Sequence, residues 1–178
     1  MSEQRNQHPF ITHLESLRDN RAALADLRRA LSSELGAAAA AYRHVVRAIP
    51  EAVQPGTWEW TCYTQIAALF ALHPALTARG NLGDHFATTL KPNEEGNEAI
   101  ERRFTNLLMA HPDDLAFHLR QAISFLRAHD VAVNWQQLLW DMRRWGYPDG
   151  QADVQQRWAT SFWRRGATPK EVVETQEQ

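Results

Sequence analysis

The chain has very little cysteine and no long apolar run. Cys62 is the only cysteine in 178 residues, which excludes an internal disulfide and any CxxC metal or redox motif, so we expect a buried structural thiol. No apolar run approaches the ~18 residues that a membrane-spanning helix needs. The N-terminus also lacks the charged-then-apolar pattern of a signal peptide. We therefore expect a cytoplasmic protein that does not enter a membrane.

The chain also lacks the residue patterns of catalytic, metal and cofactor sites. It has no HExxH motif, and His111 and His118 have no third ligand at zinc spacing. It has no GxSxG motif, and Ser124 and Ser161 fall within helical patterns. No P-loop or GxGxxG sequence is present to bind a phosphate or a dinucleotide. We expect no catalytic residue, no metal and no cofactor, and a hydrolase that uses His111 or His118 is an alternative.

Lysine is nearly absent, and the basic charge is concentrated. Lys91 and Lys170 are the only lysines among 19 basic residues, although the net charge is only -2. Residues 102–165 contain nine arginines, six aspartates, no lysine and no glutamate, which indicates a local cationic surface. The planar guanidinium of arginine suits phosphates and stacked bases better than an ammonium does. Four doublets stand out: Arg28-Arg29, Arg102-Arg103, Arg143-Arg144 and Arg164-Arg165.

Apolar residues recur at helical spacing along the chain, and no segment shows the period-2 alternation of a strand. We therefore predict an all-α fold of two small helical bundles packed together, with about eight or nine helices. Trp135, Trp145 and Trp158 fall on apolar helix faces and are predicted to lie in the core. The helices are expected at about 9–17, 21–31, 37–48, 58–72, 84–90, 98–109, 112–129, 135–145 and 152–165.

A segment rich in glycine and proline suggests the domain organisation. We predict an N-terminal bundle over 1–80, a hinge with a short helix over 81–97, and a C-terminal bundle over 98–165. The acidic tail, 166–178, is expected to be disordered. Thr57 is predicted to cap the helix that begins at Trp58, and Asn134 with Gln137 is predicted to form a capping box.

Six short motifs follow one another along the chain: Leu27-Arg28-Arg29-Ala30-Leu31, Ala41-Tyr42-Arg43, Asn81-Leu82-Gly83, Glu101-Arg102-Arg103-Phe104, Leu119-Arg120, and Asn134-Trp135 leading to Arg144-Trp145-Gly146. In their order and spacing they resemble the CasB family, the small subunits of the type I-E CRISPR surveillance complex, Cascade. The resemblance covers roughly residues 10–165.

This resemblance implies a non-catalytic, nucleic-acid-binding subunit that acts in antiviral defence. It would bind the crRNA scaffold and the separated single strands of DNA, stabilise the R-loop, contact the backbone and other Cascade subunits, and pair with a second copy of itself. Guide pairing reads the sequence in such complexes, so the protein supplies backbone contacts. The contacts carried over are Arg29, Arg43, Arg102, Arg103, Arg120, Arg143 and Arg144, with Arg28 and Arg127 as second choices.

Two further interpretations concern the arginines. Arg164-Arg165 ends a predicted helix, where cations complement the helix dipole, so this doublet needs no ligand to explain it. The alternative function is a helical protein–protein adaptor, in which the arginines pair with acidic protein surfaces and never contact nucleic acid.

Overall fold

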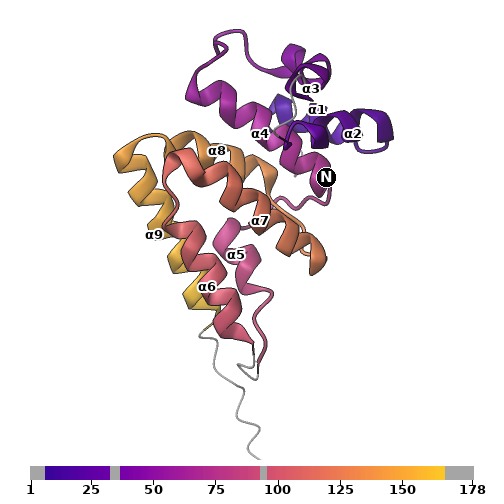
Figure 1. Ribbon diagram of the computed structural model, residues 1–178. Helices are drawn as coiled ribbons and strands as arrows, with labels where there is room; N and C mark the ends of the chain where they lie inside the picture. Colours follow the sequence, from indigo (N-terminus) through magenta and orange to yellow (C-terminus); the bar gives the residue numbers. More distant parts are fainter. Residues whose placement is uncertain (1–6, 33–36, 93–95, 167–178) are drawn as a thin grey trace, which may run out of the picture.

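The computed structural model describes residues 7–32, 37–92 and 96–166. These fold into nine α-helices and two short 3-10 helices (Figure 1), which confirms the all-α prediction for this part of the chain. The α-helices are α1 Pro9–Ser16, α2 Arg21–Arg29, α3 Ala37–Val45, α4 Trp58–Leu72, α5 Leu82–Ala87, α6 Asn97–Leu108, α7 Leu115–Ala128, α8 Trp135–Trp145 and α9 Pro148–Gly166. The 3-10 helices are η1 Val46–Ala48 and η2 Pro112–Asp114.

Side-chain caps explain where several helices begin. The Thr57 side chain accepts a hydrogen bond from the Trp60 amide, which confirms the predicted cap of α4. Asn81 and Asp84 form a reciprocal capping box at α5. This box starts α5 at Leu82, two residues before the predicted position.

The cap of α8 differs from the prediction in one respect. Asn134 accepts a hydrogen bond from the Gln137 amide at 3.1 Å, as expected. The Gln137 side chain, however, donates to the Asp141 carboxylate at 2.9 Å. Gln137 therefore turns toward a buried acid instead of closing the predicted box.

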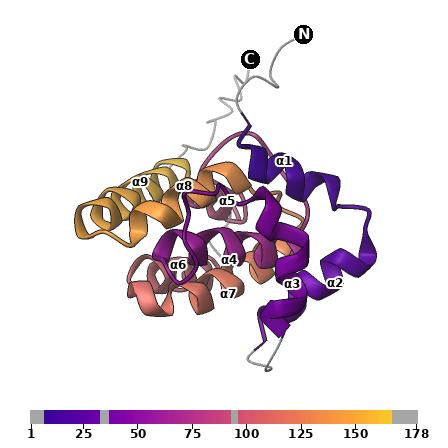
Figure 2. The ribbon, with the colours of Figure 1, turned by 90° about the horizontal axis from the view of Figure 1, so that it is seen from above.

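Helix α4 occupies the middle of the fold. It is apolar on nearly all sides, and such helices are buried. Helices α2 and α3 pack against it from one direction and α7 and α8 from another, and the two views show α1, α2 and α3 gathered away from α9 (Figures 1 and 2). The Trp58 indole nitrogen donates to the carbonyl of Met142 at 3.0 Å, which joins α4 to α8.

The buried apolar side chains form a core that extends from α1 to α9. Trp135, Trp145 and Trp158 are at most 1% exposed, which confirms their predicted core positions. Cys62 is fully buried, and burial raises the pKa of its thiol to about 12. The single cysteine is therefore the structural thiol that the sequence indicates.

Helix α5, in the predicted hinge, packs along α9. Leu82 and Phe86 are buried, and the Asn81 side chain donates to the Ser161 hydroxyl at 2.8 Å. The division into two bundles with a hinge stays a prediction. The predicted tail lies, from residue 167 onward, outside the described residues.

Across the described ranges, no helix combines the length and the apolar character that crossing a membrane requires.

Candidate nucleic-acid interface

The nine arginines carried over from the resemblance lie on five helices. Eight of them are exposed, and Arg143 is half-buried. They differ in whether an acidic side chain of this chain already forms an ion pair with them. The positions are Arg28 and Arg29 on α2, Arg43 on α3, Arg102 and Arg103 on α6, Arg120 and Arg127 on α7, and Arg143 and Arg144 on α8.

Arg29 and Arg43 meet at one buried carboxylate, that of Asp26. Arg29 Nη1 lies 2.6 Å from Asp26 Oδ1, and Arg43 forms an ion pair with Oδ2. His44 Nε2 is 2.9 Å from the same Oδ2. Hydrogen bonds from His44 and Arg43 lower the pKa of Asp26 to about 2. The fold thus places two predicted contact residues side by side, with one carboxylate shared between two guanidinium groups.

Arg143 belongs to the contact between α4 and α8. It forms an ion pair with Glu59, and its side chain is 31% exposed. Its guanidinium carbon lies 5.3 Å from the centre of the Trp140 ring and 6.0 Å from that of Tyr63, within the range of cation–π attraction. Arg143 therefore has a structural role that its place in a doublet does not reveal.

Arg144 is neutralised by α9. Its Nη2 atom lies 3.0 Å from Asp153 Oδ2, and Arg157 contacts the same oxygen at 3.1 Å. Arg157 also reaches the fully buried Asp141 at 2.9 Å, and burial raises the pKa of Asp141. Two arginines and two aspartates thus form a group with no net charge.

Five arginines make no ion pair with any described residue, and we call them the α7 surface: Arg28, Arg102, Arg103, Arg120 and Arg127. Arg103 lies over the Phe125 ring of α7, with its guanidinium carbon 4.6 Å from the ring centre. Arg120 Nη1 donates to the Leu31 carbonyl at 3.0 Å, which ties α7 to the end of α2. Helix α7 therefore contacts both α6 and the segment that follows α2.

A groove of about 230 Å³ separates α6 from α7 and contains no acidic side chain in its lining. Arg102 and Arg103 come from α6 with Asn106, and α7 contributes His118 and Gln121. Cations and neutral donors facing one groove can bind a phosphate and its neighbouring sugar or base. The sequence analysis did not select Asn106 or Gln121, although each lies one helical turn from a groove residue on its own helix.

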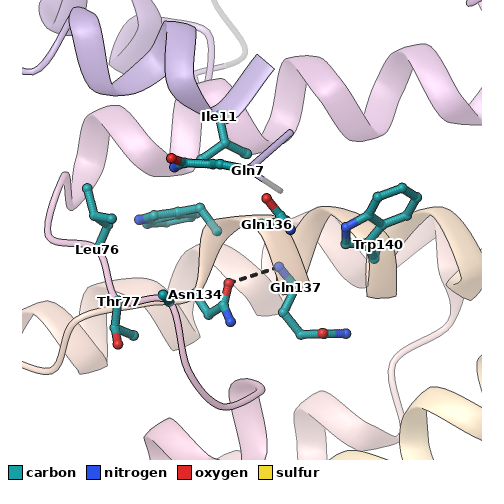
Figure 3. A pocket seen from close by; sticks show the side chains of 10 residues that line it. Gln7, Ile11, Leu76, Thr77, Asn134, Gln136, Gln137 and Trp140 are labelled. Carbon is teal, nitrogen blue, oxygen red and sulfur yellow. Dashed lines mark hydrogen bonds between the residues drawn. The ribbon is translucent and has the colours of Figure 1, made fainter. Parts of the chain in front are cut away.

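A separate cavity of about 370 Å³ is lined by uncharged side chains (Figure 3). It lies between the start of α1, the segment after α4 and the start of α8, with Gln7, Leu76 and Trp140 among its lining residues. Asn134 in its wall accepts the hydrogen bond from the Gln137 amide that caps α8 (Figure 3). None of the nine arginines lines this cavity.

The histidines considered in the sequence analysis lie apart. His111 is exposed, and its Nδ1 accepts a hydrogen bond from the Asp113 amide at 3.3 Å, whereas His118 lines the groove between α6 and α7. Within the described part of the chain, no three His, Cys, Asp or Glu side chains converge as a metal site would require.

Comparisons with known proteins agree along most of the chain. Residues 23–163 match the family model of CRISPR-associated protein Cse2. A CRISPR-associated protein Cse2 from Thermus thermophilus is 31% identical over 173 residues, covering 91% of this chain and 92% of that protein. The crystal structure of CasB from Thermus thermophilus has a TM-score of 0.71 at 28% identity, covering 87% of this chain and 96% of that one. A chain of a CRISPR RNA-guided surveillance complex shares the fold, with a TM-score of 0.70 at 23% identity and coverage of 88% and 90%.

Proposed function

Since this chain belongs to the Cse2 family of CRISPR-associated proteins, we propose that it is a subunit of a type I-E Cascade complex. We propose further that this subunit is non-catalytic and binds nucleic acid. In this role it binds the crRNA scaffold and the separated DNA strands and stabilises the R-loop. It contacts the backbone subunits and a second copy of itself. The likeness in fold to a chain of an RNA-guided surveillance complex supports this proposal.

The observation that carries the proposal is the α7 surface. Its five arginines are exposed and have no ion pair among the described residues, so each can neutralise a phosphate without first breaking an internal ion pair. They stand on helices anchored in the core, which fixes them in space. Strand exchange in an RNA-guided complex is nearly balanced in energy, so a few backbone contacts are enough to favour the open state.

Arg29, Arg43, Arg143 and Arg144 remain predicted contacts, but each already has an acidic partner in this chain. An incoming phosphate has to compete with that carboxylate. We therefore rank them below the α7 surface as contributors to affinity.

Titration of labelled single-stranded DNA into the full-length protein at several salt concentrations tests the electrostatic part of the proposal. Five phosphate contacts at about 0.7 each give an expected slope of roughly -3.5 in log affinity against log salt. Weak dependence on sequence is expected as well, because the contacts are to the backbone. Absence of binding at low salt, or binding without salt dependence, would overturn the proposal.

A second experiment separates this role from the adaptor function. In a reconstituted complex, replacing Arg102 and Arg103 with glutamine should leave assembly intact and weaken opening of the target DNA. Failure of the complex to assemble would support the adaptor, in which the same arginines pair with acidic protein surfaces.

A further inference from the structure

Phe117 is an exposed aromatic residue near the start of α7. The side chain is 61% exposed. Among the aromatic rings of the described ranges, only that of the adjacent His118 lies against it, with ring centres 5.4 Å apart. Trp140, by comparison, packs against the His8 ring and carries the Arg143 guanidinium. More than half of the Phe117 side chain is therefore available to a ligand.

The exposed stripe of α7 is cationic and contains no acidic residue. Phe117, Arg120, Gln121, Ser124 and Arg127 follow one another at successive spacings of three, one, three and three residues, and all are exposed. Residues three and four apart on a helix are surface neighbours, so Phe117 lies beside Arg120 and Gln121. Gln121 also lines the groove to which α6 contributes Arg102.

An exposed aromatic ring among unpaired arginines has the chemistry of a single-strand binding surface. A ring can stack on any unpaired base, because every base has a π-face, while the arginines hold the phosphates. In a duplex the bases are stacked on each other and cannot reach the ring. We propose that Phe117 is a stacking platform for an unpaired nucleobase, with Arg120 and Arg102 holding the phosphates next to it. This inference rests on the proposed function and adds to it a preference for single strands.

Nearby acids restrict how the strand can lie. Asp113 and Asp114 are exposed in the 3-10 turn before α7, four and three residues before Phe117. They repel phosphates at the N-terminal end of the stripe. The strand should therefore leave Phe117 toward Arg120 and Arg127, or across the groove toward Arg102.

Single exposed apolar residues are common and need no explanation by themselves. Tyr147 provides a matched control, because it is 66% exposed and lies in the connection between α8 and α9. The arginine closest to it in sequence, Arg144, is neutralised by Asp153. The two aromatic residues thus share exposure but differ in the charge around them.

The experiment measures binding of full-length variants to an oligothymidine strand with one 2-aminopurine and to a duplex of the same length. For Phe117→Ala we expect a loss of roughly 5- to 150-fold in single-strand affinity, with an unchanged salt slope because no charge is removed. Duplex affinity should not change. Phe117→Trp should retain binding and the quenching of 2-aminopurine, Phe117→Leu should lose both, and Tyr147→Ala should behave as the wild type.

The outcomes distinguish the two proposals. If the wild type binds single strands with the expected salt slope and Phe117→Ala binds equally well, stacking is refuted and the proposed function stands. An equal loss on the duplex, or full binding by Phe117→Leu, also refutes stacking. If the wild type binds no single strand even at low salt, the proposed function itself fails. Thermal unfolding of each variant verifies that the fold is retained.

Discussion

Replacing Arg102 and Arg103 with glutamine tests whether arginines without acidic partners determine affinity. Both side chains are exposed on α6 and line the groove to α7, so glutamine removes charge at the surface. Because Arg103 lies over the Phe125 ring, thermal unfolding of the variant accompanies the titration. With about 0.7 per phosphate contact, the salt slope should fall from roughly -3.5 to roughly -2.1. Extrapolated from 1 M salt, where the electrostatic contribution vanishes, this corresponds to about 25-fold weaker binding at about 0.1 M salt.

The matched control is the doublet in α8, with Arg143 and Arg144 replaced by glutamine. These arginines pair with Glu59 and Asp153, so the slope should change little. Because Arg143 also packs on Trp140, thermal unfolding must accompany the titration, and Arg144→Gln alone gives the same comparison at an exposed position. Fluorescence anisotropy with labelled single-stranded DNA measures both slopes. Equal losses for the two doublets would refute the argument that internal pairing decides which arginines bind.

Three further predictions concern the fold that carries this surface. A Cβ added at Gly83 would lie 2.0 Å from the Trp158 carbonyl oxygen of α9, so Gly83→Ala should destabilise the protein by about 1–3 kcal/mol or more, and an unchanged melting temperature would contradict the packing of α5 on α9. Trp158→Phe removes the indole N–H that donates to the buried Asp141 carboxylate at 2.6 Å; the expected cost is about 1.5–3 kcal/mol, and the melting temperature should fall by roughly 2–4 °C per kcal/mol. The pKa of Asp26 is lowered to about 2 from its ordinary 3.8, so its contribution to stability is complete above pH 3.8 and is lost as the pH falls from 3.8 through about 2. Melting temperatures between pH 2 and 5 should therefore decline less steeply in Asp26→Asn than in the wild type, and parallel declines would exclude this linkage.

Local chemistry made much of the fold predictable from the sequence. Helix α4 has the predicted bounds, because Thr57 caps it and Pro74 follows its end. The start of α9 was predicted at about residue 152 but lies at Pro148. Proline suits the first turn of a helix, whereas glycine is unfavourable in a helix interior. Gly150 is in fact helical, and a Cβ there would lie 2.3 Å from the Arg144 carbonyl oxygen. Glycine is needed at position 150 because the backbone there lies close to α8, and the local sequence does not show this approach.

The candidate site was less predictable, because its electrostatics depend on long-range contacts. The pair Asp26 and Arg29 is separated by three residues, and helical spacing could have indicated it. Arg43 reaches the same Asp26 from another helix, and Arg143 meets Glu59 from α4, 84 residues away in the sequence. Such partners depend on tertiary packing, so all the doublets look alike until the helices are placed.

Placed in the fold, the arginines form a graded series. The α7 surface has no acidic partner among the described residues, Arg29 and Arg43 share Asp26, and Arg144 belongs to a group with no net charge. A guanidinium that already holds a carboxylate gains less from a phosphate, since the new contact replaces an existing one and leaves an acid nearby that repels the ligand. Contributions to binding should therefore decrease from the α7 surface to Arg29 and Arg43, and then to the two arginines of α8. Sequence resemblance ranks Arg143 and Arg144 with Arg102 and Arg103, whereas the internal ion pairs separate them.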